Sequence, residues 1–252
     1  MNERRHKTLQ GSPLSSSSDE TAIARAVRKM FASVAHRYDF LNHLLSAGRD
    51  IAWRRAAAYA LRETLARSGS RALDVCCGTG DLALELARFS AGMVMGTDFC
   101  HTMLQRALKK IAGATHPVVF LEADTLTLPF RDDSLDVVSV AFGFRNLANY
   151  LRGLEEMRRV LRPGGTLAIL EFSRVHVPVI GALFRFYFRK LLPRIGTVIS
   201  GVPGPYQYLP DSVSRFPDQE SLAGLMREAG FTNVSYRNFS LGAAALHLGE
   251  KP

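Results

Sequence analysis

The alternation of short apolar runs with longer periodic segments, which starts at residue 71, is the feature that most restricts the fold of this chain. Apolar runs with the length of a buried strand occupy residues 71–77, 92–98, 117–124, 135–142 and 166–172. Segments with helical spacing lie at 81–90, 102–113 and 151–165, the last ended by Pro163 and Gly164. Strands that alternate with helices in this way form βαβ units, so we predict an α/β fold with a parallel sheet covered on both faces.

The C-terminal part of the chain departs from this pattern. A helical segment at 218–230 is followed by two strand-like segments, 231–239 and 243–251, with only a short link between them. So short a link joins antiparallel neighbours, because parallel strands need a long crossover. We therefore expect a mostly parallel sheet of seven strands that ends in an antiparallel hairpin.

The domain organisation follows from length and composition. With 252 residues, 47% hydrophobic and 22% charged, the chain can bury a substantial core in one domain. Residues 1–20 are rich in serine and charge and contain no apolar signal-peptide segment, so we expect a disordered leader there. Residues 21–252 are then a single domain, with an N-terminal helical cap at about 21–68 and an insertion at 173–211.

Cysteines, apolar runs and charge exclude several classes of protein. Cys76, Cys77 and Cys100 are odd in number and lack CxxC spacing, so we expect no disulfide framework and no metal site. The longest apolar run, 177–184, is far shorter than the roughly 20 residues of a membrane span. These features favour a cytoplasmic protein. The net charge of +9 suits an anionic partner, a membrane surface or nucleic acid, and requires none of them.

The segment ALDVCCGTGD, residues 72–81, indicates a cofactor site. Gly78 and Gly80 follow the first predicted strand, where a ligand meets the carboxyl ends of a parallel sheet. Asp98 lies 20 residues after Gly78, where a carboxylate accepts hydrogen bonds from ribose hydroxyls. The same segment also satisfies the G-x-G-x-x-A pattern of nicotinamide-binding proteins. By itself it leaves both kinds of cofactor open.

Three further features resemble the pattern of class I S-adenosylmethionine-dependent methyltransferases. They are Asp74 within the first strand, Asp124 after the third strand, and LRPGG leading into the fifth strand. Asp74 either braces the glycine turn or contacts the ligand. Asp81 is placed to cap the following helix, and we expect Cys76 and Cys77 to be small packing residues, since no cationic neighbour activates them.

Longer motifs resemble the ubiquinone/menaquinone biosynthesis C-methyltransferase family, with a demethylmenaquinone-type CCGTGD segment. They are YDFLNHLLSAGRDIAWRR (38–55), FGFRN (142–146), VLRPGGTLAILEFS (160–173) and YQYLPDSVSRFPDQE (206–220). The resemblance implies transfer of a methyl group from S-adenosylmethionine to a ring carbon of a polyprenylated quinol, from demethylmenaquinol to menaquinol and also for the ubiquinol precursor. A methyltransferase acting on another small molecule or on RNA is the alternative, and a cofactor-binding protein without catalysis is a third.

The resemblance also implies site residues. It places S-adenosylmethionine against Thr79, Asp98, Asp124 and Thr125, beside Gly78 and Gly80. Two positions depart from the family pattern: Ala141 stands where a serine is often found, and His43 stands where many relatives have aspartate.

For catalysis, the resemblance points to Arg145 and Asn146. A quinol ring becomes nucleophilic when a hydroxyl loses its proton, and hydrogen bonds from these side chains would stabilise the phenolate. A salt bridge to a nearby acid is the alternative role of Arg145. Tyr38, Asp39, Tyr206 and Tyr208 are weaker candidates for the quinol pocket.

The insertion has an unusual charge pattern. No Asp or Glu occurs from Phe172 to Pro210, whereas several residues in 177–194 are basic. As a helix, this segment would carry an apolar face beside Arg185 and Arg189. Such a helix suits an anionic membrane surface, where a polyprenyl tail would lie. An ordinary packing helix with a basic outer side is the alternative. We expect no nucleic-acid partner, and the oligomeric state stays open.

Overall fold

The computed structural model describes residues 20–37, 39, 43, 46, 48–111, 116–175 and 205–252. The predicted leader up to residue 19, most of the predicted insertion and Tyr38 lie outside the described residues. So does the segment 177–194, for which a membrane-facing helix is predicted.

A single seven-stranded sheet organises the described chain, in the order β3-β2-β1-β4-β5-β7-β6. The strands are β1 (Arg71–Val75), β2 (Met93–Asp98), β3 (Val118–Glu122), β4 (Leu135–Ala141), β5 (Leu161–Phe172), β6 (Thr232–Phe239) and β7 (Ala244–Glu250). The pairs among β1 to β5 are parallel, whereas β7 runs antiparallel to both β5 and β6. The predicted fold class and the C-terminal hairpin are therefore confirmed.

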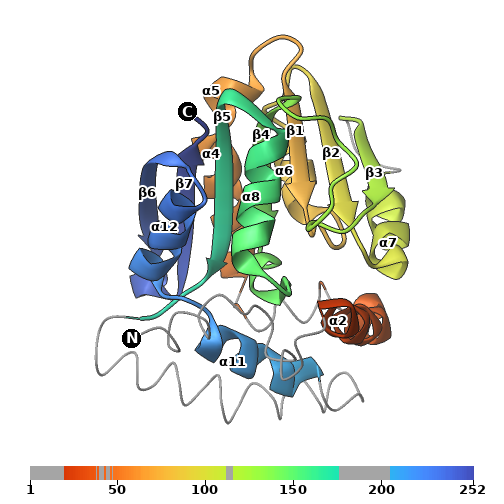
Figure 1. Cartoon of the computed structure of the whole chain (residues 1–252). Coiled ribbons are helices and arrows are strands. Elements are labelled where there is room, and N and C mark those ends of the chain that lie inside the picture. The colour runs from red at the N-terminus through yellow and green to blue at the C-terminus, as the bar shows by residue number, and fades with distance from the viewer. Residues whose placement is uncertain are drawn as a thin grey trace.

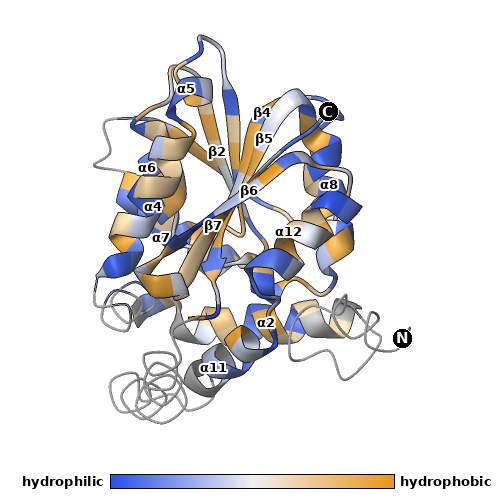
Figure 2. Ribbon diagram, turned by 90° about the vertical axis from the view of Figure 1, so that its left-hand side faces the viewer, coloured by the Kyte–Doolittle hydropathy of each residue, from blue (hydrophilic) through white to orange (hydrophobic). Residues whose placement is uncertain are grey.

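Helices cover both faces of the sheet (Figure 1). On one face lie α8 (Tyr150–Val160) and α12 (Gln219–Glu228), and on the other lie α4 (Arg49–Ala60), α5 (Arg62–Leu65) and α6 (Asp81–Ala87). The helix α7 (His101–Ile111) packs on β2 and β3. Figure 2 shows bands of hydrophobic and hydrophilic residues alternating along the covering helices, as expected when one side of a helix packs on the sheet.

The core has two parts because neighbouring residues of a strand point to opposite faces. Val138 and Val140 of β4 pack with α8 and α12, whereas Val137 packs with α4, α5 and α6. All three side chains are fully buried. Both faces of β1 and β4 are therefore covered, and these strands are almost continuously buried.

Two further helices lie across one end of the sheet. Figure 1 shows α2 (Glu20–Val34) and α11 (Pro205–Arg215) beyond the carboxyl ends of the parallel strands. Short 3-10 turns, Ala35–Arg37, Phe144–Asn146 and Ser240–Gly242, complete the described elements. The carboxyl edge of the sheet, where a ligand is predicted, is thus bounded by segments from both ends of the chain.

The helix predicted to be stopped by Pro163 and Gly164 ends earlier than these residues. The helix α8 stops at Val160, and Leu161 is already extended, with ψ at 140°. Pro163 disfavours helical geometry at the residue before it, and Leu161 instead pairs with Leu135 of β4. The LRPGG segment therefore belongs to β5.

A close approach between two loops fixes the carboxyl ends of β1 and β4. Gly143 lies so near Cys76 that a Cβ built on it would be 2.4 Å from the Cβ of Cys76. Cys76 and Phe142 have positive φ angles of 49° and 59°. Glycine is thus required at position 143 by the space available, and the two flanking loops cannot move apart or together without changing the edge of the sheet.

We predict that Gly143→Ala lowers the free energy of unfolding by about 1 to 3 kcal/mol, because the added methyl group overpacks this contact. Gly224→Ala is the matched control: position 224 is exposed in the interior of α12, with nothing within 4 Å of the new Cβ. That change should raise the free energy of unfolding by about 0.4 to 1 kcal/mol. Urea titrations of both variants measure these effects, and a neutral Gly143→Ala variant would contradict the close approach.

Candidate active site

A cavity of about 920 Å³ of empty space, its open mouth included, lies at the carboxyl edge of the sheet. Its wall contains residues 76–79, 98–99, 123–126, 141–143 and 146–148, together with Ala24, Phe31 and Arg54. The strand ends supply the first group of residues, whereas α2 and α4 supply the last three. The cavity thus lies where ligands bind in open parallel sheets.

The glycine turn forms the floor of the cavity. Gly78 and Gly80 have φ angles of 57° and 84°, which side chains rarely adopt. A Cβ on Gly80 would also meet the Phe120 ring at 2.7 Å. Gly80 occupies the N-cap position of α6, so the prediction that Asp81 caps this helix is wrong. Asp81 is instead the first helical residue.

Asp98 holds the end of β2 against this turn. Its carboxylate accepts hydrogen bonds from the backbone N–H groups of Gly78 and Cys100, both at 2.8 Å. The side chain lines the cavity, and burial raises its pKa to about 6. Each carboxylate oxygen can accept a further hydrogen bond. Asp98 therefore has a structural role in addition to the predicted role of receiving ribose hydroxyls.

Asp124 and Thr125 lie together beside the cavity, as the motif predicts. Asp124 accepts a hydrogen bond from the backbone N–H of Leu126 at 2.9 Å, which fixes the loop after β3. The Thr125 hydroxyl lies 3.3 Å from the sulfur of Cys76 and so connects this loop to β1. Ala141 also lines the cavity and contributes only a methyl group where relatives often carry a serine hydroxyl.

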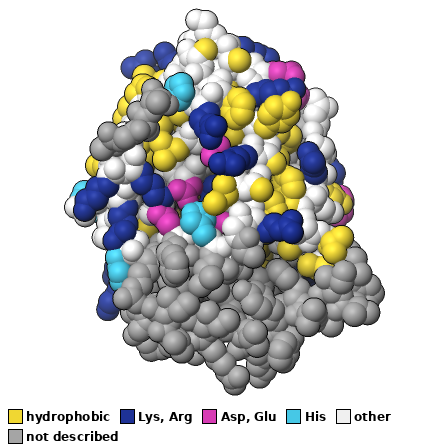
Figure 3. Space-filling model, turned by 180° about the vertical axis from the view of Figure 1, so that it is seen from behind, with side chains coloured by type: hydrophobic (Ala, Val, Ile, Leu, Met, Phe, Trp, Pro, Cys, Tyr) yellow, Lys and Arg dark blue, Asp and Glu magenta, His cyan; other side chains and the backbone are white. Residues whose placement is uncertain are grey.

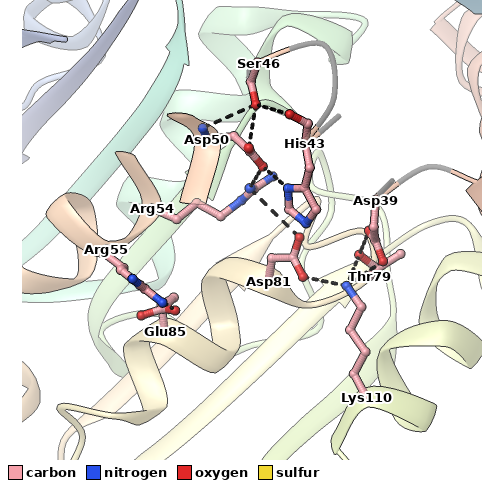
Figure 4. Close-up of polar contacts among 10 residues, drawn as sticks. All are labelled: Asp39, His43, Ser46, Asp50, Arg54, Arg55, Thr79, Asp81, Glu85 and Lys110. Atoms are coloured by element: carbon pink, nitrogen blue, oxygen red, sulfur yellow. Dashed lines mark hydrogen bonds and ion pairs between the residues drawn. The ribbon is translucent and has the colours of Figure 1, made fainter. Parts of the chain in front are cut away.

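Thr79 is part of a polar network that joins the glycine turn to the N-terminal helices (Figure 4). Its hydroxyl donates to Asp39 at 2.5 Å and accepts from Lys110 at 2.8 Å. Lys110 also pairs with Asp39 and Asp81, at 2.7 and 2.5 Å. Because the Thr79 hydroxyl and the Asp39 carboxylate are engaged in this network, both side chains brace the cavity wall.

Arg145 and Asn146, adjacent in sequence, occupy different environments. Arg145 is buried and forms a salt bridge with Glu171 at 3.0 Å; the same carboxylate accepts the backbone N–H of Arg145 at 3.2 Å. The alternative role given to Arg145 from the sequence is thus the one that the structure contains. Arg145 is not in the cavity wall, whereas Asn146 is, and the Asn146 amide oxygen accepts a hydrogen bond from the Tyr208 hydroxyl at 3.0 Å.

The two adjacent cysteines are half-buried and lie in acidic surroundings. Burial, followed by the charge of Asp98, raises the pKa of both Cys76 and Cys77 above that of an ordinary thiol. Both thiols therefore stay protonated at neutral pH, which makes them poor nucleophiles. This agrees with their interpretation as small packing residues at a crowded turn.

The sequence reasoning missed the contribution of the N-terminal helices. Arg54 lines the cavity, and its Nη1 atom lies 2.5 Å from Asp50, one helical turn earlier. The pairing of an acid and an arginine four residues apart was a usable signal for a fixed guanidinium. Nothing in the local sequence, however, indicates that α4 packs against the glycine turn. The side chain of Tyr206, another candidate, lies outside the described residues.

Asp74 lies beneath the cavity, 1% exposed, and accepts a hydrogen bond from the Ser139 hydroxyl at 2.9 Å. Burial raises its pKa from 3.8 to about 7. The native protein therefore retains this proton over a pH range in which the unfolded chain has lost it. Stability contributed by the protonated form must fall as the pH rises through this range, and level off above about pH 7.

We predict that Asp74→Asn becomes more stable relative to the parent protein as the pH rises. The difference in free energy of unfolding should shift by about 2 to 3 kcal/mol between pH 5 and pH 8, because the amide has no proton to lose. Urea titrations at both pH values measure it, with the exposed Glu228→Gln as a control for loss of a surface carboxyl. A difference that stays constant over this range would contradict the protonation of Asp74.

The arrangement of strands is that of known methyltransferase structures. A S-adenosylmethionine-dependent methyltransferase from Thermotoga maritima, described as a possible histamine N-methyltransferase, superposes with a TM-score of 0.65 at 19% identity, over 89% of this chain and 99% of that one. The [4+2]-cyclase SpnF superposes with a TM-score of 0.64 at 19% identity, over 90% and 95% of the two chains. At this level of identity the likeness concerns the fold alone, since one of these structures is named as a cyclase.

Sequence comparison is more specific. The model of the ubiE/COQ5 methyltransferase family matches residues 17–251. A protein named demethylmenaquinone methyltransferase from Deinococcus radiodurans is 48% identical over 92% of this chain and 95% of its own length. One of the same name from Thermus thermophilus is 46% identical over 88% and 100%. A ubiquinone/menaquinone biosynthesis C-methyltransferase from Geobacter sulfurreducens is 43% identical over 92% and 90%. The chain therefore belongs to the ubiE/COQ5 methyltransferase family, a family of S-adenosylmethionine-dependent methyltransferases.

Proposed function

We propose that the protein transfers the methyl group of S-adenosylmethionine to a ring carbon of demethylmenaquinol and so forms menaquinol. The observation that carries this proposal is the 48% and 46% identity, over nearly full length, to two relatives named for that reaction. The ubiquinol precursor is the second candidate acceptor, because the third relative is named for both quinones. In either case a ring carbon beside a hydroxyl receives the methyl group.

We propose that S-adenosylmethionine, the methyl donor, binds at the carboxyl edge of the sheet. The ribose hydroxyls donate to the free lone pairs of Asp98, and the adenine lies against Asp124 and Thr125. The glycine turn at Gly78 and Gly80 lets the backbone approach the ligand closely. Support comes from the position of all five residues at the carboxyl edge of the sheet, where nucleosides bind in open parallel sheets.

The chemistry requires a phenolate at the acceptor. A phenol with a pKa near 10 is mostly protonated at neutral pH, so hydrogen bonds to the oxygen must favour loss of the proton. Asn146 is the cavity-lining residue of the FGFRN motif that can donate such a bond, because its oxygen is held by Tyr208 and its N–H groups remain for the acceptor. We propose that Arg145 positions this loop through Glu171 and does not touch the acceptor.

An RNA substrate, one of the alternatives, has less support than a quinol substrate. The family name and the relatives' names refer to quinones where they specify a substrate. Figure 3 shows Lys and Arg side chains in several separate groups on the face opposite to that of Figure 1, interspersed with hydrophobic and acidic ones. Within the described part of that face there is no continuous basic surface of the kind that binds a phosphate backbone.

The proposal predicts that cells lacking this protein accumulate demethylmenaquinone and lose menaquinone. The purified protein should also methylate chemically reduced demethylmenaquinone, with a mass increase of one methyl group on the ring and none on transfer RNA supplied in parallel. Quinone profiles by mass spectrometry and labelled methyl transfer measure the two effects. A normal menaquinone content in the deleted cells would contradict the proposal.

We further propose that the protein works at the inner surface of the membrane, where a polyprenylated quinol resides. None of the helices in the described ranges is long and apolar enough to cross a membrane. The support is the composition of residues 172–210, which contain five basic residues and no acidic one. Each basic residue near an anionic surface contributes about 1 kcal/mol of attraction, which salt weakens.

We predict that the protein sediments with anionic liposomes at low salt, and that Arg185→Glu combined with Arg189→Glu abolishes this binding. The control is Arg67→Glu combined with Arg131→Glu: both residues are exposed, precede β1 and β4, and change the net charge equally. The first double variant should turn over a long-tailed quinol in vesicles poorly and a short-chain soluble analogue normally. Equal losses on both substrates would instead show that the segment serves the active site itself.

A further inference from the structure

Arg54 lies in the wall of the cavity although no cofactor motif includes it. It belongs to α4, whose Trp53 and Ala57 anchor the helix in the core, and its own side chain is 8% exposed. Figure 4 shows the guanidinium between Asp50 of the same helix and Asp81 at the start of α6. A cation on the N-terminal helix thus reaches the glycine turn.

The guanidinium is held in one orientation. Its Nη1 atom is 2.5 Å from Asp50 and 3.9 Å from Asp81, and its central carbon lies 5.3 Å from the centre of the Phe142 ring. Asp50 is in turn bound by His43 at 2.8 Å and by Ser46 at 2.5 Å. Burial would raise the pKa of Asp50, but the Ser46 hydroxyl and the charge of Arg54 lower it, so Asp50 is a carboxylate.

Part of the guanidinium is left for a ligand. The contacts of Arg54 with the described residues use Nη1 or the face of the group, and among these residues none binds Nε or Nη2. A guanidinium has five N–H donors, and donors buried away from water require acceptors. Since Arg54 lines the cavity, these remaining donors are available to a molecule bound there.

The charges around Arg54 indicate which chemical group of a ligand would bind there. Arg54 is the one Lys or Arg among the described residues that line the cavity, and beside it lie the carboxylate of Asp81 and the carboxyl group of Asp74, whose oxygens can accept a hydrogen bond whether or not Asp74 keeps its proton. A group that carries both a carboxylate and an ammonium matches this set, because each charge meets its opposite. An amino-acid head group is such a group, and arginine binds carboxylates in a planar, two-bond geometry.

We infer that Arg54 binds the α-carboxylate of S-adenosylmethionine, with the ammonium group on the side of Asp74 and Asp81. The adenosine of the donor is proposed at Asp98 and Asp124, so the amino-acid end extends past the glycine turn toward α4. This inference rests on the methyl donor of the proposed function and not on the acceptor. Donor binding would then depend on the N-terminal helix, which the cofactor motifs do not include.

The test compares three adenosine derivatives: S-adenosylhomocysteine has the carboxylate and the ammonium group, decarboxylated S-adenosylmethionine has the ammonium group and a sulfonium, and 5′-methylthioadenosine has neither carboxylate nor ammonium group. Because they also differ at the sulfur, each ligand is compared between protein variants and not with the other ligands. Calorimetric titration measures their dissociation constants for the parent protein, Arg54→Gln and the control Arg55→Gln. Arg55 is the next residue, is exposed, and pairs with Glu85 away from the network (Figure 4). No quinol is used, so an error in the proposed acceptor does not affect the result.

We expect Arg54→Gln to weaken S-adenosylhomocysteine about 10- to 100-fold, as for loss of hydrogen bonds to a charged group. The two ligands without a carboxylate should change less than about threefold, which also shows that the variant is folded. Arg54→Lys, which keeps the charge but not the planar group, should recover part of the affinity. Arg55→Gln should bind all three ligands as the parent does.

Two results would overturn the inference. If Arg54→Gln weakens all three nucleosides equally, Arg54 only braces the cavity wall. If it leaves S-adenosylhomocysteine binding unchanged, the carboxylate lies elsewhere.

Discussion

The carboxylate of Asp98 is the interaction on which the rest of the site depends. It accepts the backbone N–H of Gly78 from the turn after β1 and that of Cys100 from the start of α7. The turn after β1 and the segment from the end of β2 to the start of α7 are thereby held together. A buried carboxylate normally has a high desolvation cost, which these two hydrogen bonds offset in part, and the pKa of about 6 reflects that balance. This group therefore helps to fix the shape of the glycine turn.

The N-terminal helices close the site by charge and not by apolar packing alone. Lys110 binds Asp39, Asp81 and the Thr79 hydroxyl, and Arg54 and Asp50 continue the network toward α4 (Figure 4). Networks of partly buried charges are strong when every member is paired and costly when one is removed. The same groups therefore fix the position of the helices and leave defined donors and acceptors facing the cavity. Our inference that Arg54 binds the donor would link donor binding to the placement of the N-terminal segment.

Arg145 and Asn146 are adjacent in one motif, but their side chains lie in different places. The arginine is turned into the protein, where Glu171 receives both its side chain and its backbone N–H. The asparagine is turned toward the cavity and is oriented by Tyr208 of α11. Removing one member of a buried ion pair leaves an uncompensated charge, so the arginine is needed for the loop to keep its shape. In the proposed function, Arg145 therefore supports the reaction without touching the reacting molecules.

Local sequence determined the alternation of strands and helices, the C-terminal hairpin, the glycine turn and the position of Asp98 and Asp124 at successive strand ends. These features depend on the periodicity of apolar residues and on the turn preference of glycine, which act over a few neighbouring residues. The end of α8 at Val160 was missed because pairing with Leu135, 26 positions earlier, takes up Leu161.

Only the tertiary structure decided which partner each polar side chain meets. Asp81 would cap a helix in isolation, but Lys110, from the next helix, binds it; Arg145 meets Glu171 from a neighbouring strand. Arg54 enters the cavity because α4 packs beside the glycine turn. Charge–charge and hydrogen-bond partners are set by distances of a few ångströms in the folded chain, and sequence spacing carries no record of those distances.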